Sequence, residues 1–338
     1  MKQDQIEKHS TKILTIGVGV IGTTYSWQLQ KAGFDITHFV RGNKIGEYKE
    51  QGIKMRCLDL RKPGGVVVEE CYRPDFVGDF SANDGYEYIL VSVNSDQLAD
   101  LLPVLDSKAG NATIVFLQNM RIGDDELISQ HLDHARYVIA YPFKAGGGRT
   151  GNVIDTVIFG LSLSNTVLGE VNGKTTARVK TLHSMLKKAD MNPQIIPDII
   201  PYIRTHYVWG ACCLAAYIKA GSYERFIQDD LIKESYLAMR EGWEICVRQG
   251  ISPRKVAPTK YYYLPFFLLI PVTKWLYSQK GMREMFEGHI QHSPVEMKDM
   301  YFTLLARGKK YGVKMPIYEG YQKYLEDYFS KPVRHGVL

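Results

Sequence analysis

Continuous apolar runs alternate with amphipathic stretches through the first half of the chain. The runs at residues 13–16, 88–93, 112–117 and 137–141 are typical of parallel strands that are buried on both faces. Apolar residues at 3- and 4-residue spacing between these runs predict helices at 21–32, 95–102 and 124–131. Further strands are predicted at 35–40, 53–58, 65–70, 153–159 and 166–169. This alternation predicts an α/β Rossmann domain with a doubly wound, mostly parallel sheet.

The pattern changes from strands to helices after residue 175. Apolar residues recur with helical spacing at 176–189, 198–219, 231–249 and 296–311. We therefore expect two domains, an α/β domain over 11–175 and a helical domain over 176–338.

A glycine-rich turn follows the first predicted strand and opens the first helix. It has the GxGxxG form, with the sequence Gly17-Val18-Gly19-Val20-Ile21-Gly22. The first glycine allows a tight turn, the second lets a pyrophosphate approach the backbone, and the third permits close helix packing. The helix N-terminus adds amide donors for the phosphates. Because the motif stands between a strand and a helix, it predicts dinucleotide binding.

The end of the second strand indicates which dinucleotide is bound. An acidic residue there binds a ribose 2′-hydroxyl group, whereas a basic residue accommodates a 2′-phosphate. This chain has Arg41 at that position and no carboxylate until Glu47. The sequence therefore favours NADP(H) over NAD(H).

Composition and charge narrow the class of protein further. The chain has 338 residues, 45% of them apolar, and a net charge of +6, which is too small and scattered for a nucleic-acid-binding protein but suits small anionic ligands. Five cysteines without CxxC spacing, and no apolar leader, favour a reducing cytoplasm. The aromatic stretch 261–277 contains two prolines and a lysine, so we expect no membrane span. It is interpreted as a buried or subunit-contacting segment of a homodimer, with membrane contact or a pocket cover as alternatives.

Several short segments resemble the ketopantoate reductase family, the 2-dehydropantoate 2-reductases, within the 6-phosphogluconate dehydrogenase-like superfamily. They are the glycine-rich turn with Arg41, residues 91–94 followed by Gln97, 117–119, 168–173, and Glu296 followed by Leu304, Gly308, Gly312, Val313 and Pro316. The resemblance implies a Rossmann domain joined to a helical domain, with hydride transfer from NADPH to a 2-oxo acid in the cleft between them. It also implies that Gln97 contacts the cofactor, that Asn119 contacts both nicotinamide and substrate, and that Glu296 holds the substrate or the catalytic side chain.

The chain departs from the family where the resemblance implies a catalytic lysine. The family's lysine and two asparagines lie on one helical face, but here the lysine register falls between Tyr202 and His206 and the asparagine positions are apolar or glycine. Asn94 also replaces a lysine that is usual after the fourth strand. If the site is catalytic, His206 is the expected general acid and Arg204 a carboxylate clamp, with Tyr202 a third choice.

No metal site is expected, because the histidines form no HxH or HExxH pattern; His289 and His292 have helical spacing but no recognisable partner.

The glycine-rich motif and the family resemblance together predict an NADP(H)-dependent oxidoreductase that reduces a 2-oxo acid or related carbonyl compound. Two alternatives stay open. One is an opine-type or other 2-hydroxy-acid dehydrogenase of the same superfamily, and the other is a non-catalytic NADP(H)-binding sensor.

Overall fold

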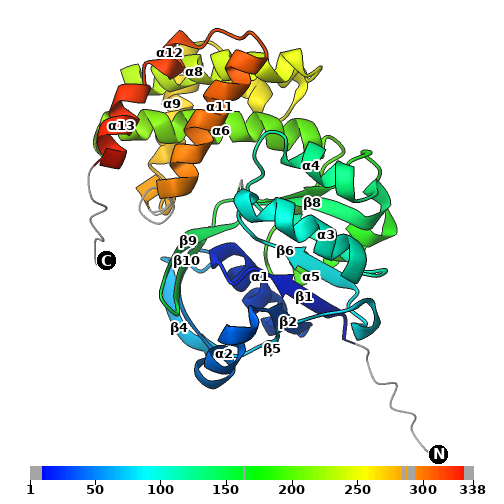
Figure 1. Ribbon diagram of the computed structural model, residues 1–338. Helices are drawn as coiled ribbons and strands as arrows, with labels where there is room; N and C mark the ends of the chain where they lie inside the picture. Colours follow the sequence, from blue (N-terminus) through cyan, green and yellow to red (C-terminus); the bar gives the residue numbers. More distant parts are fainter. Residues whose placement is uncertain (1–9, 163, 284–285, 288–293, 331–338) are drawn as a thin grey trace, which may run out of the picture.

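The computed structural model describes residues 10–162, 164–283, 286–287 and 294–330. An α/β lobe contains the first half of the chain, and a lobe of helices contains the second half (Figure 1). The two lobes meet along α6 (Ile199–Ala220), the longest helix, which passes above the carboxyl edge of the α/β sheet.

An eight-stranded sheet forms the centre of the α/β lobe, in the order β12-β11-β8-β7-β6-β1-β2-β5. Every pair is parallel except β8 with β11. The strands are β1 (Lys12–Ile16), β2 (Asp35–Phe39), β5 (Asp75–Val77), β6 (Tyr88–Val91), β7 (Thr113–Leu117), β8 (Tyr137–Pro142), β11 (Thr166–Gly169) and β12 (Pro193–Ile195). The predicted doubly wound, mostly parallel sheet is therefore confirmed.

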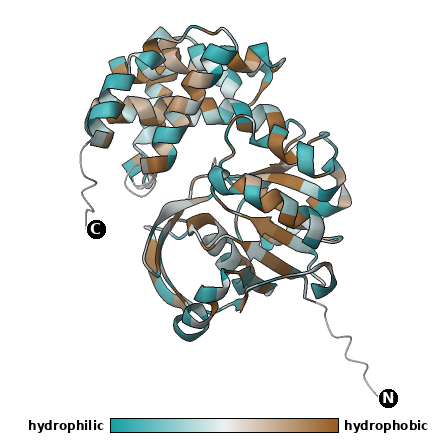
Figure 2. Ribbon diagram, viewed as in Figure 1, coloured by the Kyte–Doolittle hydropathy of each residue, from teal (hydrophilic) through white to brown (hydrophobic). Residues whose placement is uncertain are grey.

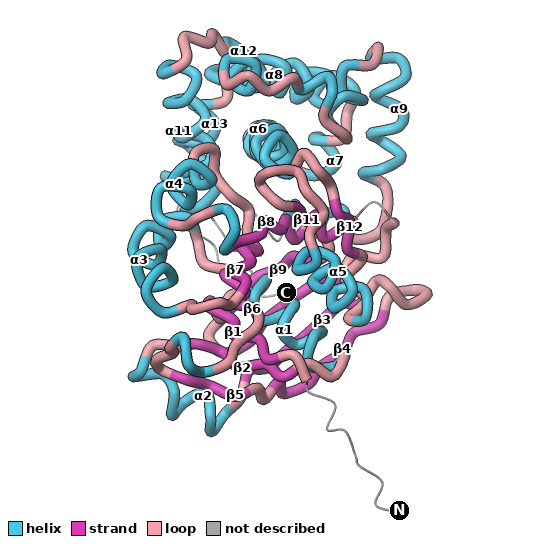
Figure 3. Tube along the Cα trace, turned by 90° about the vertical axis from the view of Figure 1, so that its right-hand side faces the viewer, coloured by secondary structure: helices cyan, strands magenta, loops and turns pink. Residues whose placement is uncertain are grey.

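Helices cover both faces of this sheet, as Figure 3 shows. On one face, α1 (Val20–Lys31) and α5 (Ala177–Lys188) contribute buried side chains such as Leu29 and Leu182 to one core cluster. On the other face, α3 (Leu98–Lys108) and α4 (Asp124–His131) contribute Leu102 and Ile128 to another. The central strands are coloured as hydrophobic in Figure 2, as expected for strands covered on both sides.

A second sheet of four strands packs beside α1, in the order β4-β3-β10-β9. Its strands are β3 (Ile53–Asp59), β4 (Val66–Tyr72), β9 (Ala145–Thr150) and β10 (Val153–Ile158). Strands β3, β4 and β10 agree with strands predicted from the sequence, but their separation from the main sheet was not predicted. Strand β9, whose three consecutive glycines read as a loop, was not predicted either, and neither were β5 and α2 (Ile45–Gln51).

The α/β lobe extends further along the chain than the expected boundary at residue 175. Helix α5 packs its buried side chains onto the sheet, and β12 pairs with β11. Both elements lie within the range that was assigned to the helical domain. The helical lobe begins with α6, because the chain leaves the sheet after Ile195.

The helical lobe is built around α6 and α8 (Asp229–Arg248), with Trp243 and Leu304 fully buried between helices. The other helices are α7 (Tyr223–Phe226), α9 (Phe266–Tyr277), α11 (Pro294–Lys310), α12 (Pro316–Glu319) and α13 (Gln322–Ser330). Short 3-10 helices occur at Gly42–Lys44, Ala82–Asp84, Ser95–Gln97, His134–Arg136, Pro253–Lys255 and Thr259–Tyr263.

The aromatic stretch 261–277 is buried on one side only. Leu269, Thr273 and Tyr277 of α9 face the core. The opposite face exposes Tyr261, Leu264, Phe267, Leu268, Val272 and Trp275. Within the described residues, no helix combines the length and hydropathy that crossing a bilayer requires.

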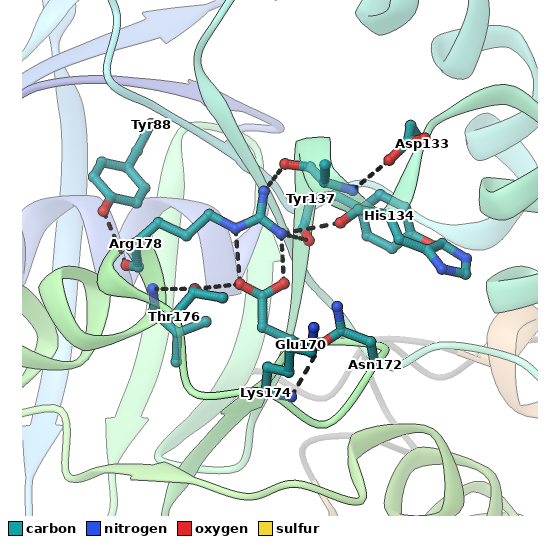
Figure 4. A network of polar contacts seen from close by, with 11 residues as sticks. Tyr88, Asp133, His134, Tyr137, Glu170, Asn172, Lys174, Thr176 and Arg178 are labelled. Atoms are coloured by element: carbon teal, nitrogen blue, oxygen red, sulfur yellow. Dashed lines mark hydrogen bonds and ion pairs between the residues drawn. The ribbon is translucent and has the colours of Figure 1, made fainter.

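A buried ion pair fastens α5 to the sheet (Figure 4). Arg178 Nε donates to Glu170 Oε1 at 2.8 Å, and the Arg178 guanidinium also bonds the carbonyl oxygens of His134 and Tyr137 at 2.9 and 3.0 Å. Thr176 donates its hydroxyl to the same Glu170 oxygen at 2.5 Å. Glu170 belongs to the 168–173 segment that carries part of the family resemblance, so this segment stabilises the fold rather than forming a binding site.

Candidate active site

The carboxyl ends of the parallel strands bring the candidate residues to one edge of the main sheet. Ile16 pairs with Phe39 on one side and with Val91 on the other, and Val91 in turn pairs with Phe116. The residues that follow these strand ends therefore lie in a row along the edge. A crevice outside such an edge is where open α/β sheets bind ligands.

In the glycine-rich turn, Gly19 has open space beside it, whereas Gly17 and Gly22 are closely packed. The space beside Gly19 is an open approach for a ligand. Gly17 has φ +110°, and a Cβ there would meet the carbonyl oxygen of Ser92 at 2.3 Å. A Cβ on Gly22 would meet the carbonyl oxygen of Gly17 at 2.5 Å. Gly19, the N-cap of α1, has no heavy atom within 4 Å of its ideal Cβ. Gly17 and Gly22 thus hold the turn against the sheet, whereas Gly19 leaves space for a ligand beside the α1 N-terminus.

Gln118 gives a second indication that this edge accommodates a polar ligand. Its side chain is only 6% exposed and lines the cavity, yet neither its amide nitrogen nor its amide oxygen has a hydrogen-bond partner in the described structure. An unpaired buried polar group costs about 1–3 kcal/mol. The open approach at Gly19 and the unpaired amide of Gln118 both fit a nicotinamide dinucleotide, whose phosphates and carboxamide need amide partners.

Basic side chains lie at the same end of the turn. Arg41 follows β2 and is exposed, and its side chain makes no ion pair or hydrogen bond with a described residue. Arg149, which the sequence analysis missed, bonds the carbonyl oxygen of Val18 and the Tyr48 hydroxyl group. Lys44 pairs with Glu47 at 2.8 Å. Gln97 is exposed at the start of α3 and does not line the cavity.

A cavity of about 480 Å³ lies between the two lobes and begins at the glycine-rich turn. The α/β lobe contributes Gly19, Val20, Ile21, residues 92–96, Gln118, Asn119, Arg121 and Tyr141 to its lining. The helical lobe contributes His206, Trp209, Gly210, Leu214, Phe286, Glu296 and Asp299. One cavity therefore joins the predicted cofactor site to three of the four predicted catalytic residues. No residue of the stretch 261–277 lines it.

The face of α6 that lines this cavity has the spacing predicted for the missing lysine and asparagines. His206, Gly210 and Leu214 follow one another at i, i+4 and i+8, and all three line the cavity. Of the positions between 202 and 206 that the resemblance allowed for the lysine, His206 lines the cavity, and Gly210 and Leu214 follow it at the spacing of the two asparagines. Tyr202, four residues earlier, is buried under His206 and does not line the cavity.

Aromatic rings surround His206 and change its acidity. Its ring centroid lies 4.2 Å from that of Tyr141, 5.0 Å from that of Trp209 and 5.7 Å from that of Tyr202. Burial among these rings lowers the pKa of His206 to about 3. The imidazole is therefore neutral near pH 7, which differs from the expectation that it titrates in the working range.

Asn119 and Glu296 face the cavity from opposite lobes. Asn119 follows β7, and its Nδ2 lies 4.0 Å from Sδ of Met300 on α11. Glu296 lies in the first turn of α11, and its carboxylate makes no hydrogen bond or ion pair with a described residue. The sequence resemblance therefore predicted the location of both residues, while their chemical roles stay predictions.

Arg204 does not reach the cavity, so the structure opposes its expected role as a carboxylate clamp. Its guanidinium donates to Asp125 Oδ2 at 2.6 Å and to Glu126 Oε1 at 3.0 Å, both on α4. On an α-helix, residue 204 points about 200° away from residue 206, because successive residues are separated by about 100°. Arg204 instead links α4 to α6 across the lobe boundary.

Two residues that line the cavity, Arg121 and Tyr141, were not predicted from the sequence, because their place in the cavity depends on residues that are distant in the sequence. Arg121 follows Asn119 by two residues, donates to Asp299 Oδ2 at 2.7 Å and lies 3.7 Å from Asp124 Oδ1. Tyr141 was predicted only as part of a buried strand, but its ring faces the cavity at the end of β8. Burial, with a further contribution from the charge of Glu296, raises the pKa of Tyr141 well above its usual value.

The described part of the chain contains no group of three or more His, Cys, Asp or Glu side chains suited to a metal ion. His289 and His292 lie outside the described residues.

Two comparisons relate the sequence of this chain to ketopantoate reductases. Residues 13–172 match the family model described as ketopantoate reductase PanE/ApbA. A curated 2-dehydropantoate 2-reductase from Aquifex aeolicus (strain VF5) is 22% identical over 313 residues, which cover 91% of this chain and 94% of the relative.

Solved structures share the whole two-lobed fold. The ternary structure of D-mandelate dehydrogenase with NADH and anilino(oxo)acetate has a TM-score of 0.70 at 16% identity, covering 94% of this chain and 97% of that one. A 2-dehydropantoate 2-reductase structure from Geobacter metallireducens GS-15 has a TM-score of 0.66 at 17% identity, covering 94% of this chain and 99% of that one. At these identities the structural likeness establishes the fold.

Proposed function

We propose that this chain, which carries a ketopantoate reductase PanE/ApbA family domain over residues 13–172, is an NADP(H)-dependent oxidoreductase. It reduces a 2-oxo acid or a related carbonyl compound in the cavity between its lobes. The observation that carries this proposal is the single cavity, in which the open approach at Gly19 continues to Asn119, His206 and Glu296. The proposed cofactor and substrate residues therefore share one cavity, which brings the reactants together as hydride transfer requires.

The bound cofactor supplies the hydride, and the residues of this chain bind and orient the reactants. The α1 N-terminus beside Gly19 donates amide groups to the pyrophosphate, and Arg41 binds the 2′-phosphate that distinguishes NADP(H). The Gln118 amide has a free donor and a free acceptor for the nicotinamide carboxamide. Asn119 donates a hydrogen bond to the carbonyl oxygen as negative charge develops there.

The proton for the new alkoxide comes from a side chain that faces the carbonyl oxygen. His206 and Tyr141 both face the cavity, with ring centroids 4.2 Å apart. If His206 donates the proton, His206→Gln should lower turnover of the best oxo acid about 100-fold while NADPH affinity stays unchanged. Unchanged turnover in His206→Gln, together with its loss in Tyr141→Phe, would assign the donor to Tyr141 instead.

The choice of oxo acid depends on α6, where the side chains differ most from the family pattern. Gly210 and Leu214 replace hydrogen-bonding amides and leave an apolar wall. This wall, together with the similarity in fold to D-mandelate dehydrogenase, favours a second candidate, a dehydrogenase for 2-hydroxy acids with a bulky apolar substituent.

One experiment tests the function directly. NADPH and NADH are incubated with the purified protein and a panel of 2-oxo acids that includes ketopantoate, pyruvate and phenylglyoxylate, and cofactor oxidation is followed by absorbance. We expect NADPH oxidation with at least one of these acids. Tight NADPH binding without oxidation of the cofactor by any carbonyl compound would favour the non-catalytic sensor.

We also propose a reducing, cytoplasmic location, which is supported by the five cysteines, none of which forms a disulfide. The homodimer stays a prediction, and light scattering during size-exclusion chromatography would measure it.

A further inference from the structure

Among the described residues that line the cavity, acidic side chains outnumber basic ones. Arg121 is the one lysine or arginine in the described lining, and its guanidinium is engaged by Asp299 at 2.7 Å. Glu296 lies one helical turn before Asp299 on α11, faces the same space and has no described hydrogen-bonding or ion-pair partner. A carboxylate that faces a cavity without a partner favours a cationic ligand over an anionic one.

Aromatic rings line the same cavity as this carboxylate. Trp209 lies 5.0 Å from His206 and 6.5 Å from Phe143, measured between ring centroids, and Tyr141 completes the group. The faces of such rings attract organic cations. Gly210 and Leu214 add no charge to the opposite wall, so nothing described on α6 offsets the charge of Glu296.

The two side chains that a carbonyl substrate would use as proton donors, His206 and Tyr141, are both weak acids in this cavity. Burial lowers the pKa of His206 to about 3, so its imidazole is neutral. Burial and the charge of Glu296 raise the pKa of the Tyr141 hydroxyl group well above its usual value. Reduction of a ketone produces an alkoxide that must be protonated, whereas a substrate that already carries its proton has no such need.

We propose that this cavity binds and reduces a protonated imine, a cationic carbon–nitrogen double bond with an aromatic or bulky apolar substituent. The inference rests on the proposed function for its reductant, a reduced nicotinamide dinucleotide. Hydride adds to the imine carbon, the π electron pair of the C=N bond becomes the nitrogen lone pair, and the nicotinamide is oxidised. The product is a neutral amine that keeps its N–H bond, so the protein donates no proton.

The residues take specific parts in this reaction. Glu296 accepts a hydrogen bond from the iminium N–H group and balances its charge, while Trp209 and Tyr141 hold the cation against their faces. An anionic 2-oxo acid would instead place its carboxylate near Glu296, and Arg121 would have to leave Asp299 in order to bind it.

The test compares two aromatic compounds of similar size and opposite charge. Dihydroisoquinoline, which is protonated near neutral pH, and phenylglyoxylate are each offered with NADPH, and kcat/KM is measured for both. We expect at least about a tenfold preference for dihydroisoquinoline. Glu296→Gln should lower its kcat/KM about tenfold or more, and should lower the ratio of its kcat/KM to that of phenylglyoxylate by a similar factor. Glu244→Gln on α8 removes the same charge outside the cavity and is the matched control.

A binding measurement makes the inference independent of turnover. Calorimetric titration of the NADP⁺ complex should show tighter binding of tetrahydroisoquinolinium than of benzoate, and Glu296→Gln should remove that difference. Tighter binding of benzoate to the wild-type protein would overturn the inference whatever the kinetics.

The failures of the two proposals differ. Faster reduction of phenylglyoxylate, increased further by Glu296→Gln, would overturn the imine inference and leave the proposed function standing. Absence of NADPH oxidation with either compound and with the full panel of oxo acids would overturn both.

Discussion

Replacing Gly19 with alanine should separate cofactor binding from folding. The ideal Cβ at this position has no heavy atom within 4 Å, and the backbone has φ −86° and ψ −178°, an extended conformation that alanine readily adopts. Alanine restricts the unfolded chain, which stabilises a protein by about 0.4–1 kcal/mol, but it is a poorer N-cap than glycine by a similar amount. The free energy of unfolding of the cofactor-free protein should therefore change by less than about 1 kcal/mol.

The effect on the cofactor should be much larger. The methyl group would occupy the space through which the pyrophosphate approaches the α1 N-terminus, so the phosphates would lose backbone hydrogen bonds. Hydrogen bonds to charged groups contribute about 1.5–3 kcal/mol each. Losing two of them costs at least about 3 kcal/mol, which corresponds to more than about a 100-fold increase in the NADPH dissociation constant.

Calorimetric titration with NADPH, combined with thermal unfolding of the cofactor-free protein, measures both quantities. Gly22→Ala is the structural contrast, because its Cβ would lie 2.5 Å from the Gly17 carbonyl oxygen and should lower stability by about 1–3 kcal/mol. Gly46→Ala, in open space on α2, is the neutral control for binding. Wild-type NADPH affinity in Gly19→Ala would show that the phosphates bind elsewhere and would refute the assignment of this turn.

Arg41→Ala should weaken NADPH at least about tenfold and leave NADH unchanged, because only NADPH carries the 2′-phosphate; equal losses in parallel titrations would contradict this. Glu170→Gln should lower the free energy of unfolding by about 3 kcal/mol, because it leaves the Arg178 guanidinium partly unpaired. Urea unfolding measures that loss, and a change below about 1 kcal/mol would argue against a structural role. Burial lowers the pKa of His38 to about 3, so the unfolded chain binds its proton first and stability falls as the pH drops from 6.5 towards 3. His38→Gln should therefore reduce the slope of stability against pH by about 1.4 kcal/mol per unit between pH 4 and 6, and an unchanged slope would show that His38 is already charged in the folded state.

Much of the fold could be predicted because local patterns determine it. The runs at 88–93 and 112–117 contain enough apolar side chains for strands covered on both faces, and the structure buries them as β6 and β7. Strand β9 could not be predicted in this way, since its glycines carry no periodicity and its pairing with β10 creates the strand. The three-residue β12 is likewise defined by its partner β11, which explains why the α/β lobe continues past residue 175.

The candidate site likewise contains residues that the sequence could locate and residues that it could not. Gly19 could be located from the spacing of the glycine-rich motif, and Asn119 from the family resemblance of residues 117–119. Residues whose role depends on a partner could not. Arg204 is near His206 in sequence, but the Arg204 guanidinium forms an ion pair with Asp125 on α4 and does not line the cavity. Tyr141 was indistinguishable from its buried neighbours until the cavity showed which face of β8 is open.

The cofactor half of the cavity depends on backbone geometry and the substrate half on side chains. Substitutions can therefore change one half without changing the other. The cofactor half depends on backbone geometry at β1 and α1, where a Cβ at Gly17 or Gly22 would collide with backbone atoms. The substrate half depends on side chains of α6 and α11, and positions 206, 210 and 214 can change without disturbing that backbone. NADPH affinity therefore carries no information about the substrate. Only a compound that responds to Glu296→Gln, with cofactor affinity unchanged, identifies the chemistry of the substrate half.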